Sequence, residues 1–140
     1  MSPLKLLHRN DEGAAAIEFA ISLPVLLVMI YGIFQVGLVF QANAGMQHAL
    51  GEGARYATLC TPTSTGCNSP SDSAVVTRMS SKVFGMNIGT FSTPTVTTPA
   101  TTDCTHCKDL QVSYTMTPSY LFFSGPPITL TRSKRVYLAY

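Results

Sequence analysis

The stretch FAISLPVLLVMIYGIFQVGLVF, residues 19–40, decides the fold of this 140-residue chain. It has no charged residue, and the uncharged run continues to Gly51, with Ser22 and Gln35 the strongly polar exceptions up to residue 40. As a helix, residues 19–40 would be about 33 Å long, close to the roughly 30 Å hydrocarbon layer of a bilayer. A buried core helix is the alternative, but the rest of so short a chain could hardly cover it on every side. We therefore predict a membrane-spanning helix.

Charge is scarce throughout the chain. Charged residues make up 11% of the sequence, against about 25% in an ordinary soluble domain. The formal net charge of +2 provides no polybasic surface, which argues against nucleic-acid binding. The sequence shows no Ser/His/Asp grouping, phosphate-binding loop or paired carboxylates. We expect a protein that is not an enzyme and has no cofactor or metal.

The flanking charges predict the orientation of the span. Lys5 and Arg9 precede it, and the next basic residue is Arg55, so the N-terminus should stay in the cytoplasm. The chain from about Gln41 onward would then lie in the periplasm. A cleaved secretory signal is an alternative, because residues 42–44 (Ala-Asn-Ala) resemble a signal-peptidase site. However, the apolar run is longer than a signal core and contains proline, which favours a retained span.

The segment before the span carries the most specific pattern. A polar leader ends at Gly13, and the sequence Ala-Ala-Ala-Ile follows at residues 14–17, with Glu18 alone at the edge of the apolar run. A carboxylate is costly inside lipid. Glu18 therefore either lies among the lipid headgroups or meets a positive partner in an assembly.

These residues resemble the TadE-like pseudopilins of tight-adherence (Flp-type) pilus systems. Residues 110–114, Pro118 and residues 125–130 also resemble the C-terminal sheet region of that family. The resemblance implies that a prepilin peptidase cleaves between Gly13 and Ala14. It also implies that Glu18 pairs with the new N-terminus of a neighbouring subunit. Phe19, where the major Flp pilin usually has tyrosine, and the large outer part favour a minor or initiating subunit.

We expect the helix to continue beyond the membrane to Leu59, with a kink at Pro24. One side of this extension is apolar, and the opposite side carries Glu52 and Arg55 at a spacing that allows contact. The apolar side consists of Met46, Leu50, Ala54 and Ala57.

Beside the apolar side runs a stripe of small residues, Gly45, Ala49 and Gly53. Such a stripe allows the close approach of another element. It either lets the outer domain lie flush on the helix or packs against the helices of other subunits in a filament.

The remaining chain predicts a small antiparallel sheet with one short helix. We interpret residues 61–73 and 90–102, rich in Thr, Ser and Pro, as loops. Asp72 should open a helix that ends at Gly85 as its C-cap. Strict alternation at residues 110–117 predicts a strand, and residues 128–140 a second one.

Four cysteines form two local pairs, Cys60 with Cys67 and Cys104 with Cys107. In an oxidising compartment, an even number of cysteines favours disulfides, with local pairing preferred. A zinc site that includes His106 is an alternative.

The sequence thus predicts an α+β, pilin-like chain with four parts. They are a leader peptide (residues 1–13), a transmembrane helix (14–40), a periplasmic helix extension (41–59) and a small outer domain (60–140). We expect a minor pilin or pseudopilin that contributes to pilus assembly, adhesion or initiation. It would lie in the bacterial inner membrane with a periplasmic C-terminal domain, and would be incorporated into an extracellular pilus.

The expected partners are the prepilin peptidase, other pilins and pseudopilins, the inner-membrane assembly platform and the membrane itself. Two other hypotheses stay open. One is an uncleaved, membrane-anchored periplasmic binding module. The other is an oxidoreductase that uses Cys104 and Cys107.

Overall fold

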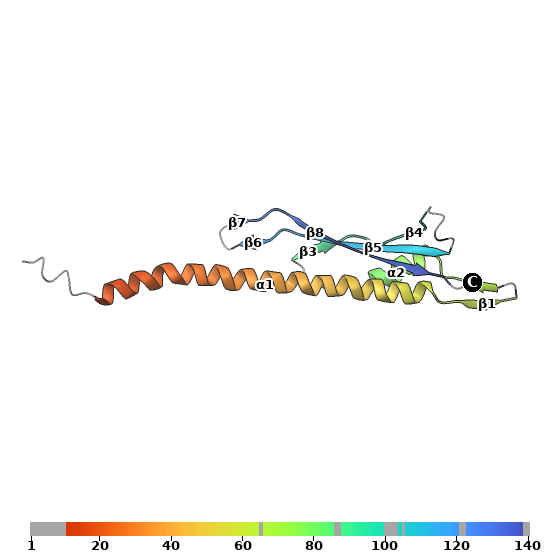
Figure 1. Cartoon of the computed structure of the whole chain (residues 1–140), viewed down its shortest axis with the longest axis horizontal. Coiled ribbons are helices and arrows are strands. Elements are labelled where there is room, and N and C mark those ends of the chain that lie inside the picture. The colour runs from red at the N-terminus through yellow and green to blue at the C-terminus, as the bar shows by residue number, and fades with distance from the viewer. Residues whose placement is uncertain are drawn as a thin grey trace, which may run out of the picture.

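The computed structural model consists of one long helix and a small domain that lies along the helix's C-terminal half (Figure 1). It describes residues 11–64, 66–85, 88–99, 104, 106–120 and 123–138. The long helix, one short helix and antiparallel strands confirm the predicted α+β fold class. Most of the predicted leader, residues 1–10, lies outside the described residues.

Helix α1 (Asp11–Ala57) spans 47 residues and includes Pro24 without a break in the helical assignment. Figure 1 shows a gentle bend in its N-terminal third, which is the consequence expected where proline removes one backbone donor. The helix ends at Ala57, slightly before the predicted Leu59. The predicted apolar side of the extension is confirmed, because Met46, Leu50, Ala54 and Ala57 are all buried.

Strand β5 (Cys107–Met116) is the centre of the main sheet. Strand β8 (Ile128–Tyr137) pairs with it antiparallel over its whole length, from Cys107 opposite Tyr137 to Met116 opposite Ile128. The residues of β5 that the alternation placed on one face, Leu110, Val112, Tyr114 and Met116, are buried. Both predicted strands and their antiparallel pairing are therefore confirmed.

The two segments predicted as loops contain short strands, so this prediction was wrong for part of each. Strands β1 (Thr61–Thr63) and β2 (Gly66–Asn68) form a hairpin. Strands β3 (Gly89–Phe91) and β4 (Thr95–Thr97) pair with the other edge of β5. Strands β3 and β4 are held in extended conformation by backbone hydrogen bonds to β5. A threonine-rich sequence does not reveal such a partner. Residues 100–102 of the second predicted loop lie outside the described residues.

Helix α2 (Asp72–Ser80) begins where Asp72 predicted it. Ser71 is its N-cap and accepts a hydrogen bond from the backbone N–H of Ala74. The predicted C-cap at Gly85 was wrong. The helix ends at Ser80, and the capping Ser81 keeps a right-handed helical conformation, so no left-handed glycine is needed.

The hydrophobic core lies between α1, α2 and one face of the sheet. Its centre is formed by fully buried side chains, namely Met46, Val75, Met79, Leu110, Val112 and Tyr114. Strands β6 (Ser119–Tyr120) and β7 (Phe123–Ser124) form a small hairpin at the end of the domain nearest the N-terminal half of α1 (Figure 1).

Both predicted local disulfides are present. Cys60 and Cys67 link the end of the α1 region to strand β2, and Cys104 and Cys107 close a short loop at the start of β5. These bonds engage all four cysteines, so none is left as a thiolate ligand for the zinc site considered as an alternative.

Candidate functional site: the two halves of the long helix

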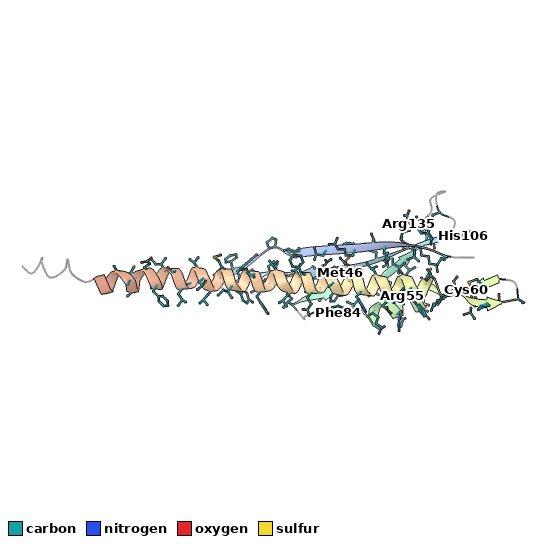
Figure 2. All side chains as sticks on the ribbon, turned by 60° about the horizontal axis from the view of Figure 1, so that its bottom comes forward. Met46, Arg55, Cys60, Phe84, His106 and Arg135 are labelled. Carbon is teal, nitrogen blue, oxygen red and sulfur yellow. A yellow bond between two sulfur atoms is a disulfide. The ribbon has the colours of Figure 1, made fainter. Side chains whose placement is uncertain are left out.

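The N-terminal half of α1, residues 13–34 and called here the bare half, is uncovered by the rest of the chain. All its residues are exposed except Val28 and Gly32, which are partly exposed. Figure 2 shows its side chains standing out around the ribbon. Only 11% of the helix's most apolar 18-residue segment is buried. The alternative of a buried core helix is therefore wrong, and α1 is long and apolar enough to cross a membrane.

At the N-terminal end of the bare half lie the residues that the sequence singled out. Gly13 and Ala14 are exposed and belong to the first turns of α1. Glu18 is also exposed, and its backbone carbonyl accepts a hydrogen bond of 2.7 Å from the Ser22 hydroxyl. None of the ion pairs found among the described residues includes Glu18. Its carboxylate is therefore available to a partner from outside the chain.

The covered half, residues 35–57, begins with a contact that the sequence did not predict. The Gln35 side chain is 8% exposed and meets the backbone of Ser119 in β6. Its Nε2 donates to the Ser119 carbonyl, and the Ser119 N–H donates to its Oε1 at 3.1 Å. Both functional groups of the amide are thus satisfied by one residue, as a buried polar side chain requires.

The signal for this contact was a glutamine inside the uncharged, apolar run of residues 19–40, where Ser22 is the other strongly polar side chain. A buried amide predicts that some partner exists, because an unpaired polar group in apolar surroundings is costly. The partner lies 84 positions away in the sequence, so local pattern could not identify it. The contact fixes the β6–β7 hairpin at the point where the bare half ends.

The stripe of small residues faces the chain's own domain. A Cβ atom on Gly45 would lie 1.8 Å from the carbonyl oxygen of Phe84, and one on Gly53 would lie 2.3 Å from Cγ of Met79. Ala49 is completely buried. The stripe therefore accommodates α2 and the segment after it, and its packing against other subunits stays a prediction.

The predicted pair of Glu52 and Arg55 is present, with 3.8 Å between oxygen and nitrogen, but Arg78 of α2 lies closer to Glu52, at 3.1 Å. Asp109 and Arg135 form a two-fold hydrogen bond across β5 and β8, at 2.8 and 2.9 Å. The Arg135 guanidinium hydrogen-bonded to Asp109 lowers the pKa of that carboxyl below its usual 3.8. These pairs link α1 to α2 and β5 to β8 on the accessible surface of the domain.

The Cys104–Cys107 pair lies at the start of the central strand of the sheet. Cys107 is buried and is the first residue of strand β5. A reactive Cys-X-X-Cys pair is usually activated by a helix N-terminus or a neighbouring cation, which lowers the thiol pKa. Lys108, the cation next to Cys107, contacts Asp72 at the start of α2, so the oxidoreductase stays a hypothesis beside that of a structural disulfide.

The fold and the bare half together define a class of protein: a small disulfide-bonded α+β domain carried on a helix that can anchor it in a membrane. Residues 13–55 match the TadE-like protein family. This match confirms the resemblance over the helix, including Gly13, Ala14 and Glu18. It covers less than half of the chain and does not extend to the strands. No curated protein and no solved structure matches the chain.

Proposed function

We propose that this chain is a membrane-anchored subunit of a tight-adherence pilus system, a minor pilin or pseudopilin with a structural rather than an enzymatic role. One observation carries the proposal. The TadE-like match includes a helix half that is apolar on all sides and bare, directly after Gly13 and Glu18. Residues 14–34 would be about 31 Å long as a helix, the thickness of a bilayer's hydrocarbon layer.

In this proposal the bare half holds the subunit in the inner membrane, with Lys5 and Arg9 on the cytoplasmic side. The domain lies in the periplasm, where an oxidising environment maintains the two disulfides. The subunit would then engage the inner-membrane assembly platform and other pilins and pseudopilins. Because the chain's own domain covers the small-residue stripe, subunits would pack in a filament mainly through their bare halves.

Processing by a prepilin peptidase would follow from the exposure of the bond between Gly13 and Ala14. Cleavage would create a positively charged α-amino group on Ala14. Glu18 lies one helical turn further on and is exposed, so it could meet the amino group of a neighbouring subunit. The pairing of opposite charges in an apolar surrounding would set the axial register between subunits.

The uncleaved binding module is favoured by one observation. Helix α1 begins at Asp11, so the Gly13–Ala14 bond is helical in this structure. A protease must unwind this turn before cleavage. Glycine at position 13 lowers the cost of unwinding, because it has a helix propensity about 1 kcal/mol below that of alanine.

Co-expression with the cognate prepilin peptidase tests the proposal. Mass spectrometry of the purified chain should show a mature protein that begins at Ala14. A chain that keeps Met1 under these conditions, while a known pilin substrate is cleaved, contradicts the pilus proposal and favours the uncleaved module.

A variant of Glu18 tests the pairing step separately. Glu18→Ala should still be cleaved but should reduce incorporation into pili at least several-fold, because the axial charge pair is lost. The control is Lys134→Gln in β8, which removes an exposed charge remote from the bare half and should leave incorporation unchanged. Normal incorporation of Glu18→Ala would show that Glu18 does not set the register.

A further inference from the structure

The end of the domain that faces the bare half has a surface unlike the rest. The β6–β7 hairpin exposes Phe123, which is 63% exposed, and Tyr120 stacks on it with ring centroids 4.9 Å apart. Ile88 and Ile128 are exposed at the same end. The sequence has no charged residue from 110 to 131. We call this surface, consisting of Ile88, Tyr120, Phe123 and Ile128, the aromatic end.

The contact with Gln35 fixes the level of the aromatic end along α1. Ser119, which Gln35 binds, directly precedes Tyr120 in β6. If Ala14 lies at the inner boundary of the hydrocarbon layer, Gln35 lies about 31 Å further along the helix. That distance places the β6–β7 hairpin at the outer boundary of the same layer, where the headgroups begin.

Charged residues begin further from the bare half. Arg132 in β8 donates a hydrogen bond of 2.7 Å to the Asn43 side chain. Asn43 is about 12 Å beyond Gln35 along the helix axis, which is at or beyond the outer limit of a headgroup region. Arg55, His106 and Arg135 lie at the end of the domain remote from the bare half (Figure 2). Among the described residues, the domain is therefore uncharged at the end near the bare half and charged towards its remote end. This gradient runs along the axis of α1.

An apolar cavity at the junction extends the same surface. It lies between the hairpin region and α1, and Tyr31, Phe34, Leu38 and Met116 line it. An opening lined by these side chains at this level would face acyl chains rather than water. The cavity makes the aromatic end continuous with the lipid-facing surface of the bare half.

We propose that the aromatic end is a lipid-contact site, through which the domain inserts Tyr120 and Phe123 into the outer interfacial layer of the membrane that α1 crosses. This inference rests on the proposed membrane anchor. Aromatic side chains concentrate at this level because their rings prefer the boundary between hydrocarbon and water. A second attachment beside α1 fixes the tilt and rotation of the domain on the membrane before the subunit is extracted.

Tryptophan fluorescence in the full-length chain tests this site, because the chain has no tryptophan of its own. Phe123→Trp reports on the hairpin. Ile30→Trp in the bare half and Tyr137→Trp at the other end of β8 are matched controls at exposed positions. Each variant is reconstituted in vesicles of phosphatidylethanolamine and phosphatidylglycerol that contain phosphatidylcholine brominated at either a shallow or a deep acyl carbon. Ile128→Trp is a second reporter of the aromatic end if Phe123→Trp folds poorly.

The proposal expects Phe123→Trp to emit at shorter wavelength than Tyr137→Trp. Shallow bromines should quench it several-fold more than deep ones do, and aqueous acrylamide should quench it several-fold less than Tyr137→Trp. If acrylamide quenches both equally while bromolipids quench Ile30→Trp, the lipid-contact site is wrong and the membrane anchor stands. Protection of Phe123→Trp from both kinds of quencher would indicate a protein contact and also overturns the site. If no bromolipid quenches Ile30→Trp, the membrane anchor itself fails.

Discussion

The two halves of α1 belong to one continuous helix, yet they differ in composition and in surroundings. The bare half is apolar on every side and exposed on almost every side. The covered half buries one side only, through residues such as Leu38, Ala42 and Met46, and leaves Gln41 and His48 exposed. A helix that is apolar all round requires an apolar environment all round, whereas an amphipathic helix requires a single partner.

The glycines show the same difference at the scale of single atoms. A Cβ atom added to Gly13 or Gly32 in the bare half would meet nothing within 4 Å. One added to Gly45 would enter the backbone of the segment after α2. Gly45 and Gly53, the glycines of the covered half that face the domain, are therefore required by its close approach, while Gly13 and Gly32 of the bare half have no such role within the single chain.

The largest expected effect is that of Gly45→Ala. Its methyl group would overlap the carbonyl oxygen of Phe84, a backbone atom that cannot rotate away, so the domain must shift from the helix. Overpacking of this kind costs about 3 kcal/mol or slightly more in unfolding free energy. Urea unfolding of the detergent-solubilised full chain, followed by near-ultraviolet circular dichroism, measures the loss.

Two control variants make this comparison specific. Gly51→Ala in the covered half and Gly32→Ala in the bare half both have open space around the added methyl. Each should leave stability unchanged or raise it by about 0.5–1 kcal/mol, because alanine favours the helix. Equal urea midpoints for Gly45→Ala and Gly51→Ala would contradict a close approach of the domain to the helix at Gly45.

The long helix and the two long strands were predictable because their signals are local. The uncharged run at residues 19–51 is longer than any ordinary core helix needs, and the alternation at residues 110–117 has the period of a half-buried strand. The two disulfides followed from the short spacing of their cysteines. Gly13, Ala14 and Glu18 were recognised from a motif confined to a few neighbouring residues, which the family match includes.

The remaining elements depend on distant partners, which local sequence does not specify. Strands β3 and β4 exist because β5 offers them backbone hydrogen bonds, and each has only three residues, too few for a recognisable alternation. The early end of α2 at Ser80 likewise follows from the position of the next segment against Gly45. The role of Gln35 required knowledge of Ser119, which no periodicity provides.

A smaller effect is expected at the boundary between the two halves. Gln35→Leu should remove both hydrogen bonds to Ser119 and leave that backbone without its partners, at a cost of about 1–3 kcal/mol. Hydrogen exchange measured by mass spectrometry should show faster exchange at residues 117–125 and unchanged exchange in β5.

Gln41→Leu is the matched control for the boundary, since Gln41 is an exposed glutamine of the same helix. It should leave exchange in the hairpin unaltered. If Gln35→Leu also leaves hydrogen exchange in the hairpin unaltered, apolar contacts alone hold the hairpin on α1. The amide contact then does not fix the boundary between the bare and covered halves.

The smallest effect concerns charge pairs, which among the described residues occur in the covered half and the domain and not in the bare half. The hydrogen bond from Arg135 lowers the pKa of Asp109 in the folded chain below its usual 3.8. A carboxyl with a lowered folded pKa stabilises the protein fully above its unfolded pKa and loses that contribution as pH falls through the folded pKa. Because the pair lies on an accessible surface, solvent screens it and the contribution is small.

Asp109→Asn should therefore lower the thermal midpoint slightly at pH 7, and the gap from the wild-type chain should close as pH falls from 4 toward 2. Lys134→Gln, a change of the neighbouring cation, should leave the pH dependence of the wild-type chain intact. A gap that stays constant over the acid range would mean that Asp109 contributes through neutral hydrogen bonding rather than through its charge. In that case the difference between the two halves would depend on apolar packing and the Gln35 contact, and the charge of Asp109 would contribute nothing to it.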